Sequence, residues 1–287
     1  GQEFLDYAIN PLVAGIYAGS PVRLSVRHAF PKLHILEQRY GSLIGGQILG
    51  ARERKRRGVP SKKDAPKFSF DEGLQTLTDA LGQRLKNRIQ TGRSVHKIHN
   101  QGGSWRLAYG QESVLSPVDY SAVLLALPSF RMARLEVSCE SQDLDLSMLE
   151  GIHYTPVTSV VLGFCREDVD HPLDGFGALI PEVEGLDSLG VIFSSSLFPG
   201  RAPEGHVLLT SYVGGMRAPD LAGEGAEKCC ERVIGDLRVV LGLKGEPTFR
   251  HTFFYPRAIP QYDVGFGRFK ARMEELEKEG TGLFFAG

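Results

Sequence analysis

The chain has 287 residues, of which 42% are hydrophobic and 23% are charged, and its formal net charge is −1. This composition predicts a soluble globular protein of about two domains with a sizeable core. The balanced charge argues against nucleic acid as a partner of the chain as a whole. No apolar run approaches the roughly 20 residues that a membrane-spanning helix needs.

The four cysteines do not form a C-x-x-C pair; they are Cys139, Cys165, Cys229 and Cys230. Zinc sites usually bring their ligands in closely spaced pairs, so the pattern favours reduced thiols over a metal centre. Reduced thiols are typical of a reducing compartment, and we therefore expect a cytoplasmic protein.

The first third of the chain is predicted to be helical and irregular. Residues 5–13 are apolar at helical spacing, and we expect Gly15, Gly19 and Pro21 to break this helix. Residues 30–40 predict a second helix, because Pro31 stands at its entrance and apolar residues recur on one side.

A basic run follows at residues 52–63, with seven lysines and arginines opposed only by Glu53. Gly58 and Pro60 interrupt it, so we expect a solvated loop. The alternative is contact with an anionic lipid surface or an acidic partner, to which each basic residue could contribute about 1 kcal/mol.

Residues 73–85 predict a helix with leucines at positions 74, 77, 81 and 85 on one face, and residues 94–98 and 105–109 predict strands joined by a glycine turn. Residues 120–127 are continuously apolar and end at Pro128. Such a run predicts a strand buried on both faces, as in a parallel sheet that helices cover.

Short strands are predicted between residues 153 and 255, at 157–164, 177–180, 191–195, 207–213 and 248–255. Residues 224–241 predict an amphipathic helix and residues 267–278 a charged one. The last predicted strand, 282–286, runs into Gly287. A strand that ends on glycine usually leads into a turn and a helix, so we expect both ends of the chain to be cuts in a longer protein.

The sequence contains no G-x-S-x-G, H-E-x-x-H, Walker or G-x-G-x-x-G motif. Gly265-Phe266-Gly267 has no strand–helix unit around it and is interpreted as a turn. His96 and His99 stand three apart in a predicted strand, which sends them to opposite faces and argues against a shared metal. The residues alone therefore predict a mixed α and β protein without self-evident chemistry.

A series of segments, taken together and in order, resembles the protoporphyrinogen oxidase family within the flavin-containing amine oxidase superfamily. The segments are AFPKL with GSLIGG (29–46), FDEGLQTL with AL (70–81), GFGALIP (175–181), LG (189–190), LFP (197–199), GG (214–215), PRAIPQY (256–262) and FAG (285–287). Three positions depart from the family pattern: Glu72 replaces a glycine, Tyr255 a tryptophan and Phe266 a histidine. The dinucleotide-binding fingerprint that the family carries near its amino terminus is absent from these residues.

The resemblance implies that FAD removes hydrogen from protoporphyrinogen IX to give protoporphyrin IX, with oxygen as the acceptor. The flavin would carry the chemistry, which accounts for the missing catalytic triad, and no catalytic or metal-binding side chain is expected. Coproporphyrinogen III stays open as the substrate. Another flavin amine oxidase relative, or a relative that has lost the cofactor, also stays open, although the GFGAL and IPQY segments argue against an amine oxidase or a carotenoid desaturase.

By the same resemblance, an apolar slot would hold the flat macrocycle between Phe176, Leu179, Ile192 and Tyr212. The residues expected near FAD are Val95, Ala126, Pro128, Tyr255 and Gly287. Each of these positions can also be explained by ordinary sheet geometry.

The expected fold is α+β, with a split Rossmann-like FAD domain, an antiparallel-sheet substrate domain and a helical, membrane-facing part. The boundaries are 1–65 for the helical part, 66–140 and 256–287 for the FAD domain, and 141–255 for the substrate domain. Porphyrinogen and oxygen are the expected partners, whereas peripheral membrane contact and a homodimer stay open. Without the dinucleotide fingerprint, the 287 residues alone are expected to be inactive.

Overall fold

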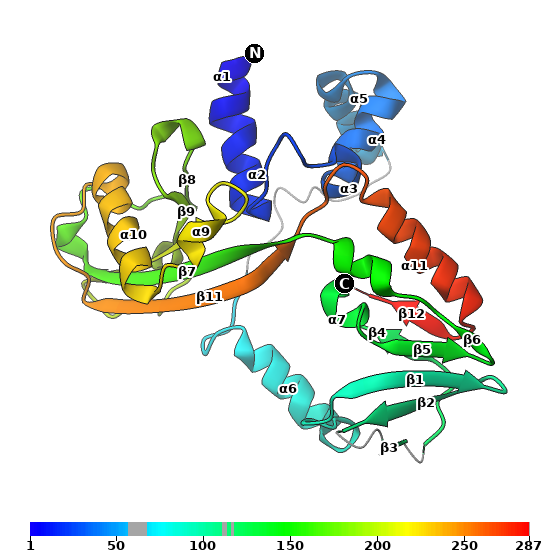
Figure 1. Cartoon of the computed structure of the whole chain (residues 1–287). Coiled ribbons are helices and arrows are strands. Elements are labelled where there is room, and N and C mark those ends of the chain that lie inside the picture. The colour runs from blue at the N-terminus through cyan, green and yellow to red at the C-terminus, as the bar shows by residue number, and fades with distance from the viewer. Residues whose placement is uncertain (57–67, 111–113, 116–117, 287) are drawn as a thin grey trace. The chain divides into compact units, whose positions relative to one another are not determined.

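The computed structural model describes residues 1–56, 68–110, 114–115 and 118–286, and these form two compact units (Figure 1). The first unit combines Gly1–Gly73 with Tyr154–Asp263, and the second combines Leu74–His153 with Val264–Gly287. Each unit thus draws on two separate stretches of sequence.

The first unit is built on a five-stranded antiparallel sheet in the order β11-β7-β10-β9-β8. Its strands are β7 (Tyr154–Cys165), β8 (Gly177–Leu179), β9 (Ser188–Phe193), β10 (His206–Gly214) and β11 (Phe249–Pro260). The five strands predicted in this stretch are confirmed. Glycine and proline residues between them supply the breaks on which that prediction depended.

Helix α10 (Ala226–Leu241) packs along one side of this sheet (Figure 1). Its buried residues repeat at helical spacing and form one core with β7, β9 and β10. The predicted apolar face of this helix, with Val233 and Leu237 at its centre, is confirmed, because both side chains are buried in that core. Cys229 and Cys230 lie in the same core and are free thiols.

The amino-terminal helices of the first unit are α1 (Gln2–Phe4), a π-helical turn (Leu5–Ile9), α2 (Asn10–Tyr17), α3 (Val26–Ala29), α4 (Pro31–Tyr40) and α5 (Leu43–Arg56). The predicted break at Gly15 is wrong, because α2 continues to Tyr17 and ends where Ala18 adopts φ 48°. A Cβ atom on Gly15 would lie 2.3 Å from Cδ2 of Leu179. This glycine therefore permits close packing and does not end the helix.

The basic run begins inside α5, so the prediction of a loop is wrong for residues 52–56. The loop prediction depended on Gly58 and Pro60, and both follow Arg56, the last described residue of the helix. Residues 57–63 lie outside the described part of the chain. No described helix has the length and apolar character needed to cross a membrane.

The second unit contains a five-stranded mixed sheet in the order β3-β2-β1-β5-β6 and a parallel pair, β12-β4. The strands are β1 (Val95–Gln101), β2 (Ser104–Tyr109), β3 (Val114–Leu115), β4 (Val123–Leu125), β5 (Glu136–Cys139), β6 (Gln142–Asp143) and β12 (Leu283–Phe285). Its helices are α6 (Gln75–Leu85), α7 (Ser129–Met132) and α11 (Gly267–Glu279). Trp105 is fully buried, and its indole N–H donates to the Thr281 carbonyl at 3.0 Å.

Two predictions for the second unit need correction. The apolar run 120–127 is not a strand buried on both faces: only Val123–Leu125 is strand, and Leu124 is 61% exposed. Phe284 lies opposite Leu124 on β12 and is 49% exposed. Helix α6 is confirmed, but its leucine face is exposed in the described structure.

The remaining helices are short. They are α8 (Ser194–Leu197), α9 (Pro219–Ala222) and the 3-10 turns Lys86–Arg88, Ser147–Gly151, Arg166–Asp168 and Glu182–Glu184. The turn Glu182–Glu184 lies in the loop that joins β8 to β9. It is therefore part of the hairpin that carries Leu179.

Candidate functional site

Three of the four expected slot residues share one face of the sheet in the first unit. Leu179 on β8 lies opposite Gly190 on β9, and Gly190 lies opposite Tyr212 on β10. Ile192, two residues along β9, lies opposite Gly177. Directly opposed residues point to the same side of a sheet, as do residues two apart along a strand. We call the side with Leu179, Ile192 and Tyr212 the open face.

The opposite side of the same strands is the covered face, which packs against α10. Val191 lies between Gly190 and Ile192 on β9 and therefore points the other way. It is buried in the core with Leu209 and Leu237. Successive side chains along each strand thus point to the open face and the covered face in turn. Leu179, Ile192 and Tyr212 all point to the open face.

Two glycines in the middle of the open face allow the neighbouring strands to approach closely. A Cβ atom on Gly190 would lie 2.7 Å from the Ala178 carbonyl oxygen. Gly177 has φ +153°, and a Cβ atom there would lie 2.1 Å from the Val191 carbonyl oxygen. Larger residues would push the strands apart at both positions. The face is consequently flat between the side chains of the neighbouring strands, which suits a flat ligand.

Helix α2 forms one wall of the open face. Gly15 lies against the Leu179 side chain, and Ala14 and Ala18 belong to a buried cluster against which Tyr212 packs. Leu179 itself remains 46% exposed. A ligand on the open face would therefore contact the sheet beside α2.

Phe176 is the fourth expected slot residue and is placed differently. It precedes β8, and its carbonyl accepts a hydrogen bond from the Phe193 N–H at 3.0 Å. Its side chain is 55% exposed. The strand register therefore does not bring Phe176 into the rows of Leu179, Ile192 and Tyr212.

Tyr212 and Tyr255 lie close to each other on the open face. Burial, and then the neighbouring Tyr255, raise the pKa of Tyr212. The phenol therefore stays neutral at physiological pH and can donate a hydrogen bond. Tyr255 also contacts Phe253, with ring centroids 4.8 Å apart and planes at 32°.

Phe253 was missed by sequence reasoning. It lies opposite Ser159, which lies opposite Tyr212, so it belongs to the open face, and it is 54% exposed. Its position two residues before Tyr255 in a predicted strand was the available signal, since alternate residues share a face. It extends the open face with a second aromatic ring at the edge of the sheet.

Two of the residues expected near FAD lie together at one edge of the second unit. Ala126 and Pro128 follow β4 directly and are exposed. The parallel strand β12 ends beside them, where the Ala286 N–H donates to the Leu125 carbonyl at 3.0 Å. Carboxyl ends of parallel strands are the usual place for nucleotide ligands in α/β sheets. We call this edge, with Ala126, Pro128 and Ala286, the carboxyl edge.

The other residues expected near FAD are not brought to the carboxyl edge by the described contacts. Val95 is the first residue of β1 in the other sheet and is half-buried. Tyr255 belongs to the first unit, and Gly287 lies outside the described residues. In the described ranges, no group of three or more histidine, cysteine or acidic residues could hold a metal ion.

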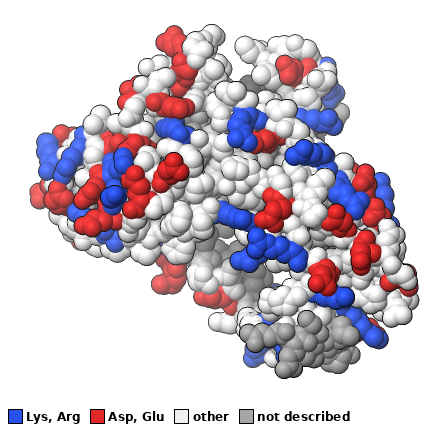
Figure 2. Space-filling view, in the orientation of Figure 1, with Lys and Arg blue, Asp and Glu red and all other residues white. Residues whose placement is uncertain are grey.

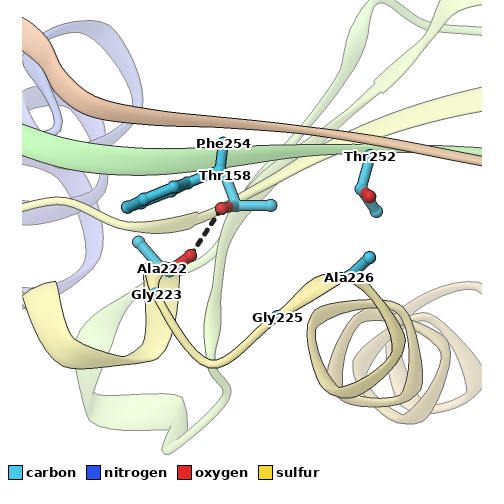
Figure 3. Close-up of a pocket in the computed structure, with 7 residues that line it drawn as sticks. All are labelled: Thr158, Ala222, Gly223, Gly225, Ala226, Thr252 and Phe254. Carbon is cyan, nitrogen blue, oxygen red and sulfur yellow. Dashed lines mark hydrogen bonds between the residues drawn. The ribbon is translucent and has the colours of Figure 1, made fainter.

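A separate pocket lies on the covered face (Figure 3). It has a volume of about 230 Å³ and is lined by Thr158, Ala222, Gly223, Gly225, Ala226, Thr252 and Phe254. The Thr158 hydroxyl donates to the Ala222 carbonyl at 2.7 Å. The pocket falls below the roughly 300–1,000 Å³ usual for drug-sized ligands, and it does not contain the expected slot residues.

The charged residues around α10 form compact ion pairs. Figure 2 shows acidic and basic side chains interspersed over this part of the surface. Arg232 contacts Asp187 at 2.7 Å and Glu224 at 2.8 Å. The hydrogen bonds that Arg232 donates to Glu224 and Asp187 raise the pKa of Arg232, and Arg232 in turn lowers the pKa of Glu224.

Comparison with known proteins shows similarity along the whole chain. Residues 1–287 match the model of the flavin containing amine oxidoreductase family. The chain is 34% identical to a mitochondrial protoporphyrinogen oxidase of Nicotiana tabacum over 307 aligned positions, which cover 100% of the chain and 61% of the tobacco protein. It is 28% identical to a coproporphyrinogen III oxidase of Bacillus subtilis, again over 100% of the chain and 60% of that protein.

The fold also has solved counterparts. A crystal structure of a proposed protoporphyrinogen oxidase from Exiguobacterium superposes with a TM-score of 0.75 at 23% identity, covering 99% of the chain and 58% of that protein. The chain thus spans about three fifths of the length of the relatives it matches. Its whole length matches one family model, and the chain therefore belongs to the flavin containing amine oxidoreductase family.

Proposed function

We propose that the protein carrying this chain is an FAD-dependent oxidase that converts protoporphyrinogen IX into protoporphyrin IX, with oxygen as the electron acceptor. The observation that carries the proposal is the open face, where strand register places Leu179, Ile192 and Tyr212 on one half-exposed, largely apolar surface. A flat macrocycle needs a surface of this kind, with few polar groups. The similarity to protoporphyrinogen oxidases supports this substrate class.

The carboxyl edge fits part of an FAD site. Ala126 and Ala286 have small side chains, so the backbone at the ends of β4 and β12 can be approached closely. We assign Ala126, Pro128, Val95 and Gly287 to the cofactor, with Tyr255 near its ring. When bound, FAD would accept the hydrogen that the porphyrinogen loses.

The residues of the open face would bind and orient the macrocycle. Leu179 and Ile192 would contact its flat surface and exclude water from it. Gly190 would let the macrocycle approach the backbone. The neutral phenol of Tyr212 would donate a hydrogen bond to a polar group of the substrate.

The domain assignment follows from the same proposal. Residues 66–140 and 256–287 would form the split FAD domain, residues 141–255 the substrate domain, and residues 1–65 a helical part toward a membrane. We place the protein in the cytoplasm, with peripheral contact through the basic run at residues 52–63. Cosedimentation of the full-length protein with anionic vesicles tests the membrane contact, and light scattering tests for a homodimer.

The decisive experiment uses the full-length protein from the open reading frame around this chain. We expect a yellow protein with a flavin spectrum and a rise of porphyrin fluorescence when protoporphyrinogen IX and oxygen are supplied. Coproporphyrinogen III is assayed in parallel, because the similarity to a coproporphyrinogen III oxidase keeps it as the alternative substrate. A flavin-loaded protein that oxidises neither porphyrinogen would contradict the proposal.

A further inference from the structure

Arg217 is a half-buried cation next to the hairpin of β8 and β9. Its Nη2 donates to the Ile180 carbonyl at 2.8 Å and to Oδ1 of Asn10 at 3.3 Å. Its Nη1 donates to the Ser188 carbonyl at 3.4 Å. Burial lowers the pKa of this guanidinium, opposed by the charge of Glu182. No salt bridge joins Arg217 to a carboxylate among the described residues, so neutral oxygens are its principal partners.

Two of these contacts join the elements that enclose Leu179. Ile180 directly follows Leu179, so its carbonyl fixes the backbone at the end of β8. Asn10 is the first residue of α2, the helix whose Gly15 lies against the Leu179 side chain. Arg217 thus connects the strand that carries Leu179 with the helix that packs on it.

The third contact fixes the start of β9. Ser188 accepts from Arg217 through its carbonyl, while its N–H and its hydroxyl donate to Asp236 at 2.7 Å and 2.6 Å. Ser188 is fully buried. The hairpin is therefore attached on one side to α10 and on the other to Arg217, and Gly190 lies two residues beyond this attachment.

The Nε of Arg217 is buried without a hydrogen-bond partner in the described structure. An unsatisfied buried donor is costly, and so is a half-buried cation that makes no direct ion pair. An apolar residue of similar length would avoid this cost, so stability alone does not explain an arginine here. The hydrogen bonds to Ile180, Ser188 and Asn10 are what an apolar residue could not supply.

We propose that Arg217 is a positioning residue for the substrate: it holds the β8–β9 hairpin against α2 and thereby sets the place of Leu179 on the open face. The inference rests on the proposed function, because it assigns Arg217 to the same substrate face. Arg217 acts through Leu179 and does not itself contact the macrocycle.

The test compares three variants of the full-length, flavin-loaded protein. Arg217→Met keeps the length of the side chain and removes all three hydrogen bonds. Arg217→Lys keeps the charge but presents all its donors on a single nitrogen, so it cannot reproduce the spread of the guanidinium. Arg238→Met is the matched control, since Arg238 is an exposed arginine on α10 that pairs with Glu246.

We expect Arg217→Met to raise KM for the porphyrinogen about tenfold, the scale set by losing hydrogen bonds to a charged group. The absorbance ratio of flavin to protein should stay unchanged. The KM of Arg217→Lys should lie between those of Arg217→Met and the wild type. The KM of Arg238→Met should equal that of the wild type. A lower melting temperature with an unchanged KM in Arg217→Met would show a purely structural role and overturn the proposal.

Hydrogen exchange separates this proposal from the proposed function. The amides of residues 177–190 should exchange faster in Arg217→Met than in Arg238→Met, without substrate present. If the wild type oxidises no porphyrinogen but this difference is found, the oxidase assignment fails and the positioning of the hairpin stands. Equal exchange in the two variants would overturn the positioning role, whatever the enzyme activity. Arg217→Lys provides the same comparison if Arg217→Met does not fold.

Discussion

The two faces of the sheet in the first unit are filled in opposite ways. On the covered face, Leu162, Phe164 and Leu237 are fully buried in one continuous apolar core. On the open face, Leu179 is 46% exposed and Phe253 54% exposed, although both are large and apolar. The same strands therefore serve stability on one side and leave apolar surface accessible on the other.

Under the proposed function, this difference assigns substrate binding to the open face and folding stability to the covered face. A protein rarely leaves a contiguous apolar surface accessible without a use for it. Because alternate residues of one strand serve the two faces, substitutions one position apart should have unrelated effects. Ile192 and Val191 are such a pair, with Ile192 on the open face and Val191 in the core.

The strongest test of the comparison places a charge on the open face. We expect Leu179→Arg in the full-length protein to reduce porphyrinogen oxidation at least about 100-fold, because an unpaired cation cannot be buried under an apolar macrocycle. Leu179 also packs against Gly15 of α2, so the folding of this variant is measured separately from its activity. Steady-state kinetics and urea unfolding measure the two effects. Near-normal kinetics in a folded, flavin-loaded variant would remove Leu179 from the site.

The reciprocal test removes a side chain from the covered face. Leu237→Ala should lower the free energy of unfolding by about 3 kcal/mol, through lost transfer energy and the cavity that remains. The KM of the folded fraction should not change, because Leu237 has no part in the open face. Urea unfolding and kinetics below the transition check both statements. A large rise in KM for Leu237→Ala with an unchanged free energy of unfolding would show that the covered face also takes part in substrate binding.

How much of this the sequence could predict depends on the range of the interactions involved. Helix α10 and the strands of the first unit were predictable, because their apolar spacing and the glycines between them are local signals. The continuation of α2 through Gly15 was not, because that glycine serves a contact with Leu179 far along the chain. The same holds for β4, since burial of Leu124 depends on which elements cover the strand.

The residues of the candidate site also differ in whether local sequence could predict them. Resemblance to a family supplied Leu179, Ile192 and Tyr212, and their roles remain predictions. Phe253 and Arg217 were missed, because the first depends on the register between β7, β10 and β11 and the second on three hydrogen bonds to distant segments. Neither relation has a signature within a short stretch of sequence.

A milder change at the open face distinguishes the contribution of the Tyr212 ring to substrate binding from that of its hydroxyl. Tyr212→Phe keeps the ring and removes the donor, so we expect KM to rise about fivefold, as for loss of one neutral hydrogen bond. Arg238→Met, which changes an exposed residue of α10, is the control for general disturbance. The two KM values measured side by side decide whether the hydroxyl binds the substrate. Equal values would restrict Tyr212 to packing against α2.

The smallest expected effect is the alkaline behaviour of the same tyrosine, which reports how far the open face is shielded from water. Burial raises the pKa of Tyr212 in the folded protein above its ordinary value near 10. In the interval between the ordinary and the raised pKa, the unfolded chain loses a proton that the folded chain keeps. The unfolded state binds fewer protons there, so the free energy of unfolding falls as pH rises through this interval. Below about pH 9 the phenol of Tyr212 is protonated in both states, so it does not make stability depend on pH. Urea midpoints measured from pH 8 to pH 11 should therefore fall less steeply for Tyr212→Phe than for the wild type, whereas Phe253→Leu should keep the wild-type slope. Identical slopes for the wild type and Tyr212→Phe would show that water reaches the phenol freely and that α2 does not shield this end of the open face.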